Sequence, residues 1–307
     1  MKTRCLIGAA VMAAAINCCN VVDAQNDFTS TNGWVRDRYA PNSFTAVMFQ
    51  GRPTLQIGID PAQSLSNRPP AYQGTFYNTQ GYKQPSAVSN GIWTVSGALW
   101  VDASTLAGTA PYRSDLWARS TPVIESNADY FIMGLFAGDL TNTADPNPTT
   151  DNFGVTWRVW DDVVGVWNNL SIPVAAGWNT ITISYDGTNV NYYLNGNPVC
   201  TDTNLGNPAY DNQLGWVFLE AYNFGNNAYT ASWSGINDSV AGPSLSLTPA
   251  GNQVTLQWPA CATNYILEAT TNLFAPNWVT ITNCAAIPCG LTMTNLCPPM
   301  FFRLHQL

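Results

Sequence analysis

Hydrophobic and polar residues alternate along much of the chain, with the period of a β-strand. In residues 153–159, apolar side chains occupy every second position, from Phe153 through Val155 and Trp157 to Val159. Such alternation predicts a strand with one face against a core. The same pattern, or a short apolar run, predicts further strands at residues 44–49, 55–59, 92–101, 130–137, 180–184, 190–195, 216–222 and 229–233. Almost no helix is expected.

Turn residues separate these strands. Asp186-Gly187 and Asn195-Gly196 are dipeptides that favour tight turns. The first lies between two alternating runs and predicts a hairpin, and the second marks a further turn. Residues 63–84 and 141–151 are long, polar and proline-bearing, and both are expected to be loops. More than ten short strands with such punctuation predict a sandwich or a barrel.

A second, smaller domain is expected at the C-terminus. Residues 240–244 contain Gly242-Pro243 and are expected to be a linker, after which strand-like patterns restart at residues 245–249, 254–258 and 264–270. We therefore expect a main domain at residues 25–241 and a small domain at residues 242–307.

Two family resemblances refine this picture. The segment Trp178–Val199 resembles the laminin-G-like signature of concanavalin-type jelly rolls, with Trp178, Asp186-Gly187 and Asn195-Gly196 at the matching places. The residues after 244 resemble the short immunoglobulin- or fibronectin-like tail domain of secreted bacterial proteins, through Val254–Trp258, Tyr265–Thr270, Trp278 and Phe301–Leu304. The expected fold is all-β: an antiparallel jelly-roll sandwich and a second, small β-sandwich. The resemblance implies an attachment role for the tail.

The first 24 residues are interpreted as a signal peptide. Lys2 and Arg4 precede the apolar stretch Leu6–Ile16, and Val22-Asp23-Ala24 offers a cleavage site before Gln25. The apolar stretch is short for a membrane span, and no later one is long enough, so no integral membrane span is expected in the mature chain. The sequence thus predicts a secreted or cell-surface protein.

The amino-acid composition limits the classes of ligand that we expect. Charged residues make up 10% of the chain and the net charge is −8, which argues against nucleic acid as a partner and favours neutral ligands or cations. Aromatic residues make up 12%, with 12 Trp, which favours a polysaccharide or surface glycan, because sugar rings stack on aromatic faces. Trp160, Trp216 and Tyr222 fall out of phase with core positions such as Trp157. With Glu220 they are the candidate ligand-binding residues.

Catalysis is not favoured by the residue counts. The single histidine, His305, lies near the end of the chain, which argues against a Ser-His-Asp arrangement. The leading hypothesis is a glycan-binding or adhesion-type protein without catalytic residues and without a cofactor. One alternative is a carbohydrate-active hydrolase or lyase that uses Glu220 with Asp129. Another alternative is a structural surface or matrix protein.

A structural calcium ion is the one metal that we consider. By analogy with related modules, Asp27 and Asp238 are its candidate ligands.

The cysteines yield a first testable prediction. Four of them lie close together in the tail and favour two disulfides in an exported chain, Cys284–Cys289 by proximity and hence Cys261–Cys297. Cys200 is left over. Thiol titration of the unreduced, denatured mature protein should find about one free thiol per chain, whereas five would contradict the prediction.

Overall fold

The computed structural model describes residues 30–86, 91–107, 110–120, 128–141, 152–207, 211–240, 245–250, 253–258, 265–273, 276–283, 290–294 and 300–306. The chain divides between Ala241 and Gly242 into two compact units. The predicted signal peptide and the four tail cysteines lie outside the described residues. Among the described residues, no helix is long and apolar enough to cross a membrane.

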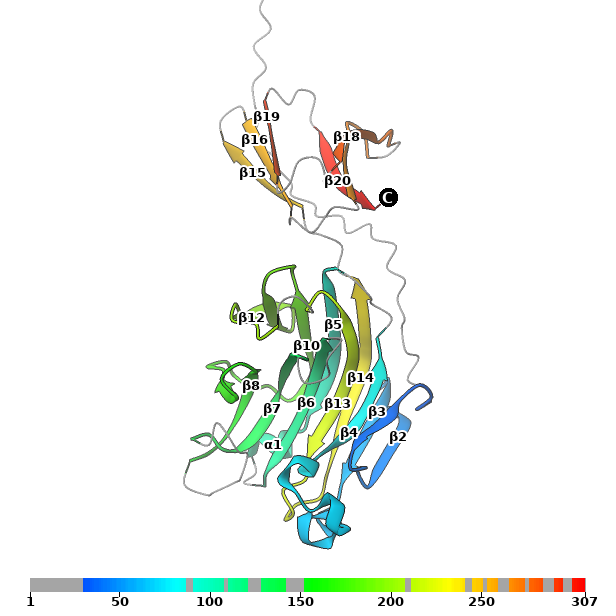
Figure 1. Ribbon diagram of the computed structural model, residues 1–307, viewed down its shortest axis with the longest axis vertical. Coiled ribbons are helices and arrows are strands. Elements are labelled where there is room, and N and C mark those ends of the chain that lie inside the picture. The colour runs from blue at the N-terminus through cyan, green and yellow to red at the C-terminus, as the bar shows by residue number, and fades with distance from the viewer. Residues whose placement is uncertain are drawn as a thin grey trace, which may run out of the picture. The chain divides into compact units, whose positions relative to one another are not determined.

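The larger unit is a sandwich of two seven-stranded antiparallel sheets (Figure 1). Sheet 1 has the order β1 (Val35–Arg38), β4 (Thr79–Pro85), β13 (Leu214–Tyr222), β6 (Tyr112–Ser120), β7 (Tyr130–Asp139), β8 (Phe153–Asp161) and β9 (Val166–Asn169). Sheet 2 has the order β12 (Asn197–Asp202), β11 (Val190–Leu194), β10 (Gly177–Tyr185), β5 (Trp93–Val101), β14 (Tyr229–Val240), β3 (Arg52–Ile59) and β2 (Ser43–Phe49). The predicted jelly-roll sandwich is confirmed.

The core lies between the two sheets and is filled by one face of each strand. Its largest fully buried side chains include Trp157 of sheet 1 and Trp93 and Trp233 of sheet 2. The alternation predicted for residues 216–222 is present in β13, where Val217, Leu219 and Ala221 enter this core. The remaining residues of that strand therefore point to the opposite face of sheet 1.

The predicted hairpin turns are present. Asp186 Oδ1 accepts hydrogen bonds from the backbone N–H groups of Thr188 (2.9 Å) and Asn189 (2.8 Å), which closes the β10–β11 turn. Gly187 and Gly196 adopt positive φ values of 100° and 79°, where a side chain would be strained. These two turns set the register of β10, β11 and β12.

Two segments differ from the sequence-based expectations. Residues 63–84, expected to be a loop, carry short 3-10 helices and the strand β4; the helices of this region are η1 (Pro61–Gln63), η2 (Leu65–Asn67), η3 (Pro70–Tyr72) and η4 (Thr75–Asn78). Strand β6 was not predicted, because its core-facing residues alternate with Arg113, Asp115 and Arg119. One α-helix, α1 (Ala103–Ala107), is present in the described residues.

The smaller unit consists of two three-stranded antiparallel sheets. Their orders are β15 (Ser246–Ala250), β16 (Gln253–Gln257), β19 (Gly290–Thr294), and β18 (Val279–Asn283), β17 (Tyr265–Thr270), β20 (Phe301–Gln306). Leu256, Trp258, Tyr265 and Leu267 form one buried cluster. The second, small β-sandwich is thus confirmed, while its likeness to immunoglobulin- or fibronectin-type tails stays a prediction.

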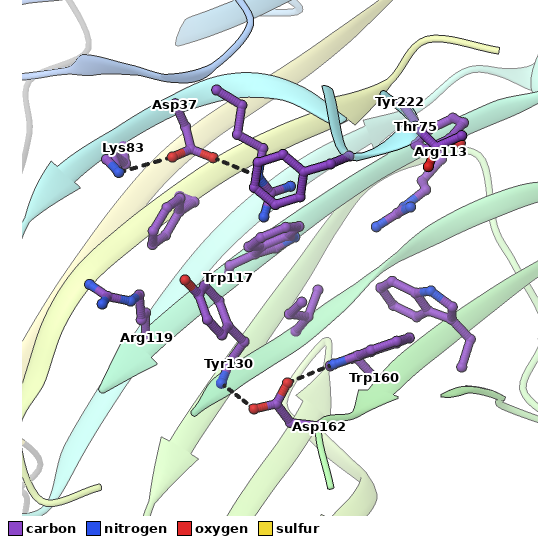
Figure 2. A pocket seen from close by; sticks show the side chains of 15 residues that line it. Asp37, Thr75, Lys83, Arg113, Trp117, Arg119, Tyr130, Trp160, Asp162 and Tyr222 are labelled. Atoms are coloured by element: carbon purple, nitrogen blue, oxygen red, sulfur yellow. Dashed lines mark hydrogen bonds and ion pairs between the residues drawn. The ribbon is translucent and has the colours of Figure 1, made fainter. Parts of the chain in front are cut away.

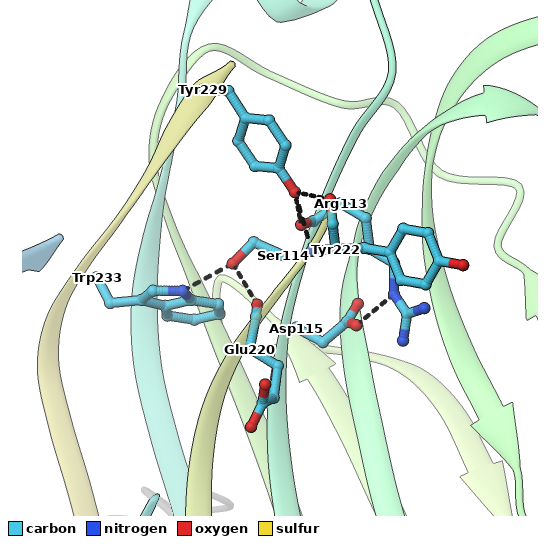
Figure 3. Close-up of polar contacts among 7 residues, drawn as sticks. All are labelled: Arg113, Ser114, Asp115, Glu220, Tyr222, Tyr229 and Trp233. Carbon is cyan, nitrogen blue, oxygen red and sulfur yellow. Dashed lines mark hydrogen bonds and ion pairs between the residues drawn. The ribbon is translucent and has the colours of Figure 1, made fainter. Parts of the chain in front are cut away.

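The hydrogen bonds that join the two large sheets include a buried one between tryptophan and serine side chains, which leads to a prediction. The indole N–H of Trp233 donates to Ser114 Oγ (2.9 Å), which itself donates to the carbonyl of Glu220 (2.8 Å) (Figure 3). Ser114→Ala leaves this buried N–H without an acceptor, so we expect a loss of about 1–3 kcal/mol in the free energy of unfolding. Denaturant titration checks this. Ser184→Ala, at a half-buried hydroxyl near water, is the control and should cost clearly less; equal losses would contradict the account.

Candidate functional site

A cavity of about 730 Å³ lies on the face of sheet 1 that points away from the core (Figure 2). We call this the pocket face. The cavity is lined by side chains of β1, β4, β6, β7, β8, β9, β13 and η4 and by the residue that follows β8. They are Asp37, Arg38, Thr75, Phe76, Lys83, Arg113, Trp117, Arg119, Tyr130, Ile132, Trp160, Asp162, Trp167, Phe218 and Tyr222. Aromatic rings and cationic groups dominate this lining.

The bottom of the pocket face is a row of charged residues, which we call the floor row. Register pairing across six adjacent strands places one residue of each strand side by side: Asp37, Gly81, Glu220, Asp115, Gly134 and Arg158. Directly paired residues in an antiparallel sheet lie about 5 Å apart. The pairing therefore sets Glu220 against Asp115, although the two are far apart in the sequence.

The two glycines of the floor row make room for the carboxylates. A Cβ atom on Gly81 would collide with the Glu220 carboxylate and the backbone oxygen of Leu219. A Cβ atom on Gly134 would collide with Oδ1 of Asp115 and the backbone oxygen of Ser114. Both acidic side chains thus lean over a neighbouring glycine and fill space that any other residue would occupy.

Glu220 is fully buried in this row. Neither of its carboxylate oxygens has a hydrogen-bond partner. Burial raises the pKa of Glu220 well above its usual value, and the negative charge of Asp37 raises this pKa further. The side chain is therefore protonated, and neutral, well above the pH at which an exposed glutamate ionises.

The other two acids of the floor row are ion-paired. Asp37 accepts a hydrogen bond from Lys83 Nζ (2.9 Å), and its second oxygen lies 3.4 Å from Nε of Arg38. Asp115 accepts a short hydrogen bond of 2.6 Å from Nε of Arg113 (Figure 3). The single carboxylate of Asp37 thus forms ion pairs with two cationic side chains.

Aromatic rings hold the cations of the pocket face. The Arg38 guanidinium lies between two rings, 4.2 Å from the centroid of Phe76 and 4.8 Å from that of Trp117. Arg113 lies 4.6 Å from the ring of Trp167. Such cation–π contacts become stronger away from water. Arg38 also adopts φ = 51°, a conformation that costs a non-glycine residue free energy and that recurs at functional sites.

The structure brings only some of the predicted ligand-binding residues to the cavity. Trp160 and Tyr222 line it, and the indole N–H of Trp160 donates to Asp162 (2.9 Å). Trp216 is half-buried and packs against the ring cluster that contains Trp117 and Phe218, and Glu220 lies beneath the lining. The predicted phase of these side chains, on the face opposite to Trp157, is the observed one.

Asp129 does not lie beside Glu220. Its backbone N–H donates to Ser120 Oγ (2.8 Å), five residues along β6 from Asp115, and its carboxylate accepts a 2.6 Å hydrogen bond from the backbone of Asn207. Burial and the neighbouring Asp129 carboxylate raise the pKa of Asp211 to about 8. The structure thus places Asp115, not Asp129, opposite Glu220.

The calcium prediction stays untested. Asp27 lies outside the described residues, and Asp238 Oδ2 accepts a hydrogen bond of 2.6 Å from Ser86. Among the described residues, no group of three or more His, Cys, Asp or Glu side chains is arranged to hold a metal ion.

Most of the lining escaped the sequence analysis. Trp117 and Arg119 lie on β6, and Phe76 lies on η4, in segments that were not predicted as strand or helix. In β6, the apolar residues Leu116 and Ala118 alternate with Trp117 and Arg119, and this alternation could have predicted the strand.

No protein-family model and no curated protein matches the chain. Solved structures with partial likeness include a sialidase (10% identity, TM-score 0.42), of which the match covers 18%, against 71% of this chain. An endo-1,3-beta-glucanase from Streptomyces sioyaensis is 12% identical, with a TM-score of 0.42, over 70% of this chain and 94% of that chain. A carbohydrate-binding module from Bacillus subtilis is 12% identical, with a TM-score of 0.34, over 67% and 95%. These values are too low to carry a function to this chain.

Proposed function

We propose that this protein is an exported glycan-binding protein, secreted or held at the cell surface, and that it binds its ligand on the pocket face without catalysis. The observation that carries this proposal is the ring-lined cavity. Phe76 is 61% exposed, and Trp160 and Tyr130 are half-buried at its wall. Exposed ring faces are costly in water and offer stacking surfaces to the C–H faces of sugars.

Polar groups accompany these rings. Asp162 holds the Trp160 indole through one oxygen and the backbone of Tyr130 through the other (2.9 and 3.1 Å). Thr75 contributes a further hydroxyl to the lining. A few oriented polar groups among aromatic walls are typical of sites that recognise a ligand by its hydroxyls and ring faces.

The carboxylates are placed badly for glycoside hydrolysis. That reaction needs two accessible carboxyl groups about 5–10 Å apart. Glu220 and Asp115 are fully buried, and the two acids of the lining are Asp37 on β1 and Asp162 after β8. Five strand spacings of about 4.8 Å separate β1 from β8, or about 24 Å along the sheet. Among the described residues, the pocket face therefore offers no acid pair that a sugar could reach.

Replacing Trp160 tests the binding site. Trp160→Ala removes one stacking surface, so we expect about a tenfold loss of affinity for the best ligand of a glycan array, corresponding to about 1.4 kcal/mol. Isothermal titration calorimetry measures the affinity. Trp178→Ala is the matched control, because Trp178 is a half-buried tryptophan on sheet 2. Equal losses in both variants would contradict the site, and release of new reducing or unsaturated sugar ends would contradict the absence of catalysis.

The buried Glu220 predicts a pH dependence of stability. Its folded-state pKa is raised above the unfolded value of about 4.3, so the folded state keeps a proton that the unfolded state releases. This contribution is fully present below the unfolded pKa and is lost as pH rises through the folded pKa, by up to about 1.4 kcal/mol per pH unit. Glu220→Gln should remove this loss.

The test compares the two proteins by denaturant titration from about pH 4 to about pH 8. The stability of Glu220→Gln relative to the native protein should rise with pH, while its glycan affinity stays within about twofold, because the side chain lies under the lining. A pH-independent difference would refute the buried neutral carboxyl group.

A further inference from the structure

The basic residues of this chain are concentrated on the pocket face. The chain has eleven Lys and Arg residues and a net charge of −8. Five of these residues lie on the pocket face: Arg38, Lys83, Arg113, Arg119 and Arg158. An acidic protein therefore carries a local cluster of basic residues in and beneath this cavity.

In the part of the chain that the structure describes, the basic residues of the pocket face outnumber its acids. The acids of the described residues on this face are Asp37, Asp115, Glu220 and Asp162, against five basic residues. The burial of Glu220 raises its pKa well above the usual value and so favours its uncharged form. The described residues of the pocket face thus carry more basic than acidic groups, in surroundings of low polarity, where charges interact strongly.

Arg158 is the clearest part of this excess. Its side chain is 1% exposed, and Nε and one terminal nitrogen have no hydrogen-bond partner. The guanidinium lies 3.8 Å from the centroid of Phe136 and 4.1 Å from that of Trp167, a ring that lines the cavity. No carboxylate of the described residues lies within ion-pair distance of it. A buried cation without an anion is costly. Arg158 does not itself line the cavity, so its charge acts on an anionic ligand group through the electrostatic field and not through a contact.

Arg38 offers a second anchor, at the other end of the floor row. It shares the single carboxylate of Asp37 with Lys83, and Phe76 and Trp117 fix its guanidinium from both sides. A guanidinium held in this way is preorganised for a planar anion, since little side-chain freedom is lost on binding.

We propose that the ligand of the pocket face is an acidic glycan, a polysaccharide that carries carboxylate or sulfate groups. This inference rests on the proposed glycan-binding function and names its ligand class. Aromatic walls bind the sugar rings, and the cations between them bind the acidic substituents. A single-stranded nucleic acid is the competing polyanion, because it also uses stacking and basic grooves.

The experiment measures binding of the secreted chain to four probes of similar length by calorimetry. The probes are an oligogalacturonate, a sulfated galactan oligosaccharide, a neutral β-glucan oligosaccharide and a single-stranded oligonucleotide. We expect one acidic sugar to bind at least about tenfold more tightly than the neutral one, with an affinity that falls as salt is raised. The first two probes distinguish carboxylate from sulfate.

Two substitutions link this preference to the pocket face. Arg38→Gln should weaken binding of the acidic sugar about tenfold or more, through loss of a charge-assisted hydrogen bond. Arg36→Gln, on the same strand and exposed outside the cavity, removes the same charge and should change affinity less than about twofold. Arg158→Met removes a positive charge beneath the lining and no ligand contact, so it should weaken acidic binding by less than Arg38→Gln does. Its melting temperature should be kept or raised, because an unpaired buried cation is replaced by an apolar chain.

Several outcomes would overturn the inference. If the neutral sugar binds as tightly as the acidic ones, and Trp160→Ala weakens that binding, the glycan-binding function stands and the acidic ligand class is wrong. If the oligonucleotide binds most tightly, the ligand class is also wrong. If none of the sugars binds, both proposals fail. Unchanged acidic affinity in both Arg38→Gln and Arg158→Met would move the site away from the pocket face.

Discussion

The period-two alternation of sheet 1 is the constraint on which the site depends. In each central strand one face must fill the core, as Leu219 does in β13, Leu116 in β6 and Trp157 in β8. Because successive side chains of a strand point to opposite faces, the residues between them face the other side of the sheet, whether or not they are charged. Strand pairing brings these residues together, so that Glu220 and Arg158, far apart in the sequence, share one row.

A row of this kind is tolerated only because its charges are compensated in different ways. Asp37 forms ion pairs with Lys83 and Arg38, and Asp115 forms one with Arg113. Glu220 has no partner and is neutral instead, since taking up a proton costs less than burying an unpaired carboxylate. The rings above the row exclude water and so create the conditions that demand this compensation.

The sequence predicted the sandwich because alternation and hairpin dipeptides act over short distances. It also placed Trp160, Glu220 and Tyr222 on the face opposite to the core. It could not predict that Asp115 is the neighbour of Glu220, because strand register between β6 and β13 depends on long-range packing. The same holds for the cations: no basic stripe exists along the chain, and the positive cluster forms only when distant strands pair. The interpretation of the ligand as neutral or cationic followed the net charge, which hides this local excess.

The balance of acidic and basic groups differs between the two ends of the floor row, and the uncharged form of Glu220 adds to this difference. At the β1 end one carboxylate faces two cations, and at the β8 end Arg158 faces aromatic rings without an acid. Were Glu220 ionised, its charge would offset part of this excess, but burial removes it. An apolar residue in place of Arg158 would pack on the same rings without the cost of a buried charge. The buried Arg158 guanidinium therefore lowers the stability of the fold but keeps a positive charge beneath the ring-lined cavity. Aromatic rings above a positive charge suit an acidic sugar chain, because the rings bind the sugar and the charge attracts its acidic group.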